Sequence, residues 1–211
     1  MRNITKSAGP PSLTAWRAQN PRNYEDYPDK DTLRDSLYAE QRGLCCYCQC
    51  RLHPAWNTMK IEHWKSREHN EDLRVVYSNL LGACLGGERK RGRDQHCDTF
   101  KGDKDLCRNP AEPSHDVEVL LSYLNDGTIV SSHAEFNQQL RTVLNMNHIT
   151  LMNSRKSVLD ALKKALWKRG TLSRGEWERI ISDWSGAGHN EELRPHCNVI
   201  IYWAQKHLAH L

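Results

Sequence analysis

The feature that most limits how this chain can fold is a crowd of cysteines in one short stretch. Four of the eight cysteines in the 211-residue sequence fall between positions 45 and 50, and this spacing leaves no room for several independent disulfides. The first twelve residues lack the apolar segment of a secretory signal, and no apolar run approaches the roughly 18 residues of a membrane span. We therefore expect a cytoplasmic protein whose cysteines bind a metal ion as thiolates.

Two pairs of cysteines are the candidate ligands of this ion. Cys45 and Cys48 form a C-x-x-C unit, in which two thiolates on a tight turn can converge on one tetrahedral ion. Cys84 and Cys97 follow on either side of a basic segment and could complete an all-thiolate site. Such a closed site is typical of structural Zn²⁺, which contributes folding free energy.

The spacing leaves alternatives for the ligand set. Cys46 or Cys50 could replace one member of the first pair, and His96 could take the place of its neighbour Cys97. Two further cysteines, Cys107 and Cys197, have no partner by spacing, and we expect them to be small core residues.

A basic loop lies between the two later cysteines. Seven of the eight residues from 86 to 93 are Gly, Lys or Arg, and we call this segment the basic loop. Its cations Arg89, Lys90 and Arg91 are candidates for contacting the phosphate backbone of a nucleic acid. The alternative is an ordinary solvated loop, because the formal net charge of the chain is only +4.

The remaining patterns predict an α+β protein with a mainly helical C-terminal half. Residues 1–30 show no sustained period and are interpreted as an arm, residues 31–110 as a core that contains the metal-binding cysteines, and residues 111–211 as a hairpin and helical region. Within the core we expect a helix over 31–43, strands over 44–52 and 58–64, and a short helix carrying 98–104. Later elements are a hairpin over 119–130, whose Asn-Asp-Gly turn tolerates positive φ, and helices over 133–146, 150–170, 173–184 and 192–211.

Five ordered blocks carry a resemblance to a known family. The blocks are EQRGLCCYC, IEHW, YSNLLGAC, HCDTFKG and LNMNHITLMNSRK. In this order they resemble the retron-associated and Septu-type HNH endonucleases, the PtuB-like family, over roughly residues 1–155. The resemblance implies a zinc-stapled ββα-metal fold, in which two strands and a helix surround a catalytic divalent cation.

The resemblance also implies a role for each residue of the ordered motif. His63 would be the general base that deprotonates water, and Glu62 and Asp98 would bind Mg²⁺ or a similar cation. Asn79 would hold the loop that carries the base through its side-chain amide, and Lys101 would contact the phosphate. Asp98 occupies a position where many relatives have His or Asn, and this favours a hard cation.

The function implied by the resemblance is that of an effector nuclease in bacterial anti-phage defence. It would act on nucleic acid, with DNA favoured over RNA, together with an ABC-type ATPase (PtuA-like) that the C-terminal helices could dock. The alternative from another class is a non-catalytic zinc-binding adaptor, which would have no need for His63, Asn79 and Asp98 in order. A thiol redox protein ranks last, because the βαβ setting of a redox C-x-x-C is missing.

Overall fold

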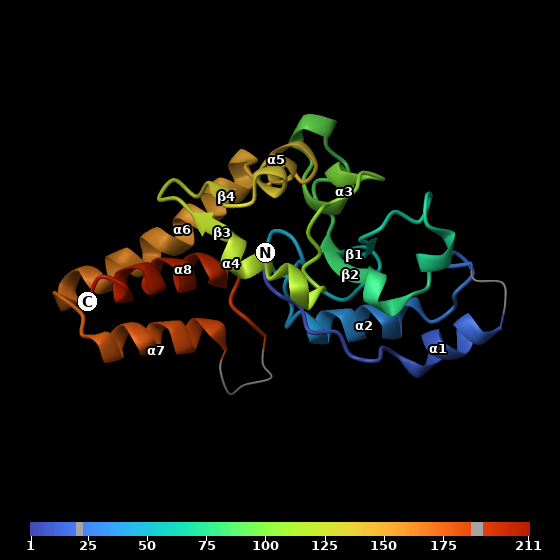
Figure 1. Cartoon of the computed structure of the whole chain (residues 1–211), viewed down its shortest axis with the longest axis horizontal. Helices are drawn as coiled ribbons and strands as arrows, with labels where there is room; N and C mark the ends of the chain where they lie inside the picture. Colours follow the sequence, from blue (N-terminus) through green and yellow to red (C-terminus); the bar gives the residue numbers. More distant parts are fainter. Residues whose placement is uncertain (20–22, 187–191) are drawn as a thin grey trace.

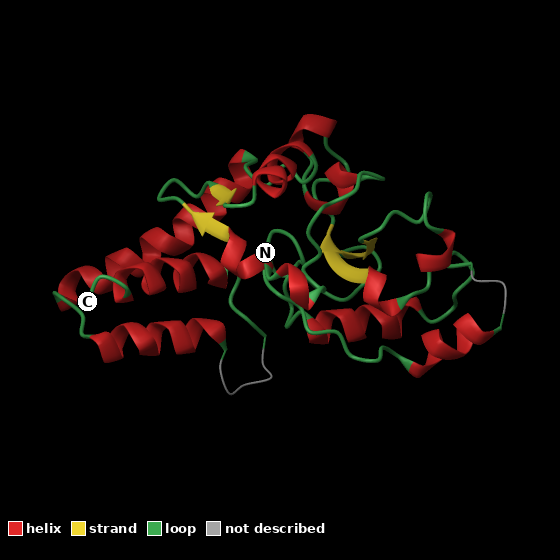
Figure 2. Cartoon of the chain, viewed as in Figure 1, coloured by secondary structure: helices red, strands yellow, loops and turns green. Residues whose placement is uncertain are grey.

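The computed structural model describes residues 1–19, 23–186 and 192–211 and confirms the α+β class. Among these residues the strands form two separate two-stranded sheets, and helices make up most of the regular structure (Figure 2). The first part of the chain contains α1 (Pro11–Ala18), α2 (Lys30–Glu40), β1 (Met59–His63), β2 (Leu80–Cys84) and α3 (Cys97–Lys101).

Strands β1 and β2 pair antiparallel and bring the motif residues together. His63 lies opposite Leu80, and Met59 lies opposite Cys84. All five residues of β2 are buried, and α3 packs against this strand. The pairing therefore places the Glu62-His63 end of β1 beside the segment that contains Asn79, and it places Cys84 at the opposite end of the sheet.

Two segments of the N-terminal region differ from what the sequence patterns predict. The expected arm over residues 1–30 contains helix α1, whose Leu13 is buried in the same core as Tyr27. The expected strand over 44–52 forms only an isolated bridge between Leu44 and Arg51. Gln49 has a φ of +62° and its N–H bonds back to the Cys45 carbonyl, so this segment is a turn rather than an extended strand.

The second part of the chain confirms the predicted hairpin and four helices. Helix α4 (Val117–Leu120) leads into the antiparallel strands β3 (Leu121–Tyr123) and β4 (Ile129–Ser131), and the helices are α5 (Ala134–Thr142), α6 (Ile149–Leu166), α7 (Arg174–Ser185) and α8 (Cys197–Leu208). Ser173 and Glu176 form a capping box at the start of α7, which satisfies N–H groups that a helix start leaves unpaired. Figure 1 shows α6, α7 and α8 together at one end of an elongated molecule, with α1, α2 and the β1–β2 sheet at the other.

One apolar core runs through the expected boundary at residues 110 and 111. It extends from Met1 to Leu151 and includes Phe136, Leu140 and Leu144, all fully buried. Because this apolar core continues past residue 110, packing does not divide the chain there, and the boundary between residues 110 and 111 stays a prediction. None of the described helices combines the length and the apolar character that crossing a bilayer requires.

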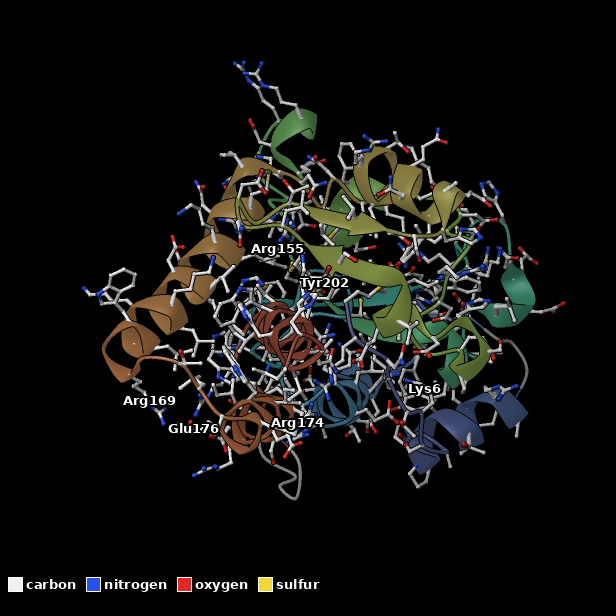
Figure 3. All side chains as sticks on the ribbon, turned by 60° about the vertical axis from the view of Figure 1, so that its left-hand side comes forward. Lys6, Arg155, Arg169, Arg174, Glu176 and Tyr202 are labelled. Atoms are coloured by element: carbon white, nitrogen blue, oxygen red, sulfur yellow. The ribbon has the colours of Figure 1, made fainter. Side chains whose placement is uncertain are left out.

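A buried arginine joins α6 to the β3–β4 hairpin. Arg155 lies inside the fold, where its side chain points from α6 toward the hairpin (Figure 3). Its guanidinium donates to the Gly127 carbonyl at 2.5 Å and to the Met146 carbonyl at 2.7 Å. These bonds hold α6 against the turn of the β3–β4 hairpin and against the segment that precedes the helix.

Candidate metal centre and active site

The structure brings Cys45, Cys48, Cys84 and Cys97 together in one buried cluster. Their Sγ atoms all lie within 4.8 Å of one another. Four sulfurs at about 2.3 Å from a tetrahedral zinc would be separated by about 3.8 Å, and the Sγ atoms of Cys48 and Cys84 are 3.7 Å apart. The donor set and its spacing therefore fit Zn²⁺, and the C-x-x-C turn supplies half of the ligands.

The three alternative ligands lie outside this group of four. Cys46 is buried and Cys50 half-buried, and neither belongs to the convergent set. His96 instead lies beside it, with Nδ1 3.2 Å from the sulfur of Cys97. The backbone N–H of Cys84 is 3.4 Å from the Cys45 sulfur, so hydrogen bonds from the surroundings also support the thiolates.

Cys97 reaches the cluster through an unusual backbone conformation. Its φ is +56°, in the left-handed region that is uncommon for residues with a Cβ. The Cys97 N–H donates to the Leu144 carbonyl at 2.9 Å, and the Asn145 amide donates to the Gln95 carbonyl at 2.7 Å. A Cβ at Gly86 would come within 2.1 Å of the His96 carbonyl oxygen, so this close approach requires glycine.

His63 ends strand β1 with its ring in a defined tautomer. The Nε2 atom is 2.9 Å from the Arg74 carbonyl oxygen, which can only accept, so Nε2 carries the proton and Nδ1 is the unprotonated nitrogen of the neutral ring. Burial lowers the pKa of His63 to about 4, and the ring is therefore neutral at pH 7. The Tyr24 ring packs edge-on against it with centroids 4.6 Å apart.

The Asn79 side chain holds the segment that follows His63. Its Oδ1 accepts from the Lys65 N–H at 2.8 Å, and its Nδ2 donates to the Lys65 carbonyl at 3.0 Å and to the Leu73 carbonyl at 3.2 Å. The Asn79 carbonyl accepts from the Trp64 N–H at 2.9 Å. These four bonds tie both ends of the loop over residues 64–73. Arg74, whose carbonyl orients the His63 ring, follows this loop directly.

Glu62 is a buried carboxylate with several fixed neighbours. It accepts from the Tyr47 hydroxyl at 2.7 Å and forms an ion pair with Lys101 at 2.9 Å, in which both side chains are almost fully buried (3% and 1% exposed). Burial and then the Asp98 carboxylate raise the pKa of Glu62 well above its ordinary value, while Lys101 lowers it. Asp98 itself lies 3.6 Å from the Lys60 ammonium.

Lys101 does not reach the position expected for a phosphate contact. Its ammonium donates to the His63 carbonyl at 3.1 Å and to Gly102 at 3.4 Å, in addition to Glu62. The side chain is 1% exposed. In this arrangement Lys101 connects α3 to the end of β1 from the interior.

His63, Glu62 and Asp98 share one hollow of about 500 Å³ on the surface. Four residues that the sequence reasoning missed also line it: Tyr24, Arg34, Trp56 and Arg67. Of the expected cations, Arg89 and Lys90 line a second hollow of about 500 Å³, and Trp56 and Glu88 belong to both hollows. Arg91 is exposed on the same basic loop. The catalytic candidates and the basic loop thus border one continuous surface.

Comparison with known proteins supports the resemblance. No family model matches the chain. It is 30% identical to the candidate HNH endonuclease of retron Ec83 from Escherichia coli, 33% to that of retron Vc95 from Vibrio cholerae, and 27% to the Septu protein PtuB from Bacillus thuringiensis. The chain resembles retron HNH endonucleases and the Septu protein PtuB. These matches cover 48%, 40% and 43% of the chain and 46%, 40% and 34% of the relatives, so each spans less than half of the relative.

Of the four carboxylates that line the hollow, Glu62 and Asp98 suit a second kind of metal. Among the described residues, the four cysteines are the only group of three or more His, Cys, Asp or Glu side chains whose ligand atoms converge closely enough to hold an ion. Glu62 and Asp98 supply two hard oxygen ligands, which fits a cation such as Mg²⁺ that completes its coordination with water and phosphate oxygens. Burial first and then the charge of Asp98 raise the pKa of Glu62, and a bound cation would offset both effects.

Proposed function

We propose that this chain is a metal-dependent HNH endonuclease that hydrolyses the phosphodiester bonds of nucleic acid. The observation that carries the proposal is the state of His63. The Arg74 carbonyl fixes the proton on Nε2, so Nδ1 is a free base in a hollow that also contains Glu62 and Asp98. The order of β1, β2 and α3 along the chain, two paired strands followed by a helix packed on β2, supports the proposal of a ββα-metal core.

His63 would act as the general base in this reaction. A neutral imidazole can take a proton from water at Nδ1 while Nε2–H remains bonded to the Arg74 carbonyl. The bonds from Asn79 hold the loop over residues 64–73, and so they keep that carbonyl in line with the ring. Asn79 is therefore a positioning residue for the base.

Glu62 and Asp98 would hold the catalytic cation. A bound Mg²⁺ would neutralise the charge that develops on the phosphate in the transition state. Lys101 keeps Glu62 oriented and favours its ionised form through the buried ion pair. The four converging thiolates would bind the structural zinc. This ion would hold together the C-x-x-C turn over residues 45–49, the end of β2 and the start of α3.

The resemblance extends the proposal to a biological role. We infer an effector nuclease of an anti-phage system that acts on nucleic acid, with DNA favoured over RNA, and that functions with an ABC-type ATPase of the PtuA kind. The helices at the far end of the molecule, α6, α7 and α8, are available to dock such a partner. We place the activity in the cytoplasm, where thiolates stay reduced and able to bind zinc.

The test is a cleavage assay on a panel of substrates. Purified protein is incubated with plasmid, single-stranded DNA and total RNA in Mg²⁺, with and without the product of the neighbouring ATPase gene. We expect cleavage that EDTA stops and that added Mg²⁺ restores. Absence of cleavage under all these conditions, in a zinc-loaded and folded preparation, would favour the adaptor alternative.

A further inference from the structure

Trp56 displays its ring to solvent from a hydrogen-bonded turn. It is 76% exposed, and of the seven tryptophans only Trp167, at 87%, is comparable, while the other five are buried or half-buried. The turn over residues 55–59 is closed by bonds from the Met59 N–H to the Ala55 carbonyl at 2.9 Å and from the Thr58 hydroxyl to the His53 carbonyl at 2.8 Å. Exposure alone assigns no role to either tryptophan, and the surroundings of the ring distinguish Trp56 from Trp167.

The surroundings of Trp56 indicate what it binds. The ring lies where the hollow of His63 meets the hollow of the basic loop, because Trp56 lines both. Arg34 and Arg67, which also pair with Asp31 and Glu25, line the first hollow beside the carboxylates already described. Arg89 and Lys90 line the second hollow, where Glu88 is the one carboxylate among the lining residues. An aromatic platform between cations matches a nucleotide chain, whose phosphates contact the cations while a base stacks on the ring.

We propose that Trp56 stacks on an unpaired base next to the cleaved phosphodiester, so that the substrate is single-stranded at the position of cleavage. This inference rests on the proposed function, which locates the scissile phosphate beside His63. The faces of bases within a duplex are covered by their neighbours, and a base becomes available to the ring only where the strand is unpaired or the base is extruded. An exposed platform is therefore matched to single strands, bubbles or flaps.

The inference is tested by binding rather than by cleavage. In a His63→Ala background, which does not cut, fluorescence anisotropy measures the affinity for labelled single-stranded DNA, single-stranded RNA and a blunt duplex of one sequence. Trp56→Ala should weaken binding of single strands roughly 5- to 150-fold, as expected for the loss of one stacked base. Trp56→Phe should retain most of the affinity, and duplex binding should change far less in both variants.

Trp167→Ala is the matched control, because Trp167 is as exposed but lies at the end of α6, away from the β1–β2 sheet. We expect its affinity for every oligonucleotide to equal that of the parent, and circular dichroism and zinc content verify that each variant is folded. Unchanged single-strand affinity in Trp56→Ala, or an equal loss for duplex and single strands, would overturn the inference. So would finding no nucleic-acid binding in the parent, which would make Trp56 a contact for a protein partner.

The two proposals fail in different ways. If the parent protein binds single strands through Trp56 but cleaves no substrate, the stacking role of Trp56 stands and the nuclease proposal is wrong. If the protein cleaves in Mg²⁺ at the same rate with and without the Trp56 ring, the nuclease proposal stands and the stacking role is wrong.

Discussion

Replacing Lys101 by Met should destabilise the protein far more than an ordinary lysine substitution. Methionine keeps an unbranched stem but removes the ammonium that pairs with Glu62 at 2.9 Å, in a site where the two side chains are 1% and 3% exposed. Breaking a buried pair by removing one partner costs about 3–5 kcal/mol, because the Glu62 carboxyl must then either stay charged without its partner or take up a proton, as its raised pKa favours. For a chain of this size that loss lowers Tm by roughly 6–20 °C.

Lys65→Met is the matched control for this prediction. Lys65 pairs with Asp105 at 3.0 Å, but the two side chains are 31% and 62% exposed, so solvent screens the pair and we expect a loss below about 1 kcal/mol. Thermal unfolding followed by circular dichroism, in zinc-loaded protein at neutral pH, measures both. The double variant Glu62→Gln with Lys101→Met should be more stable than Lys101→Met alone, because no charge remains buried. If the Lys101→Met variant has the same Tm as the Lys65→Met control, the reasoning is refuted.

Three further predictions concern the zinc site, the basic loop and the shared core. Purified protein should contain about one zinc per chain; Cys48→Ser should lose it and fold poorly, whereas Cys107→Ser should keep it, as elemental analysis would show. Neutralising residues 89–91 should lower the slope of log affinity against log salt concentration by the equivalent of up to about three phosphate contacts. An unchanged slope in a salt titration would contradict their role. Ending the chain at residue 131 removes the fully buried Phe136, so this fragment should be insoluble; a soluble, zinc-loaded fragment would show that the helices serve docking alone.

The convergence of four cysteines could be predicted from sequence because their spacing leaves few choices. A C-x-x-C unit and two more cysteines on either side of a loop predicted one group, and the structure places Cys97, not His96, in that group. The predicted strand over 44–52 was wrong because of the same convergence. Bringing the sulfurs of Cys45 and Cys48 close together requires a tight turn, and this requirement overrides the strand propensity of the segment.

The residues that surround the ordered motif could not be predicted. Trp56 and Arg34 belong to no sequence motif. They line the hollow because of how the turn over residues 55–59 and helix α2 pack against the rest of the fold. The sequence shows that Lys101 is charged, but its burial against Glu62 follows only from the contact of α3 with the sheet. Helix α1 was missed because its Pro-rich start resembles an irregular arm, although Pro is favoured in the first turn of a helix.

The most direct test of the central claim compares the parent protein with His63→Ala in Mg²⁺, on the substrate that the panel identifies as cleaved. His53→Ala is the matched control, since His53 is exposed ten residues earlier in the chain. We predict that His63→Ala loses about 10²–10⁴-fold in cleavage rate, while its zinc content and Tm equal those of the parent and His53→Ala cuts normally. Cleavage by folded His63→Ala protein at the parent rate would contradict the assignment of His63 as the general base.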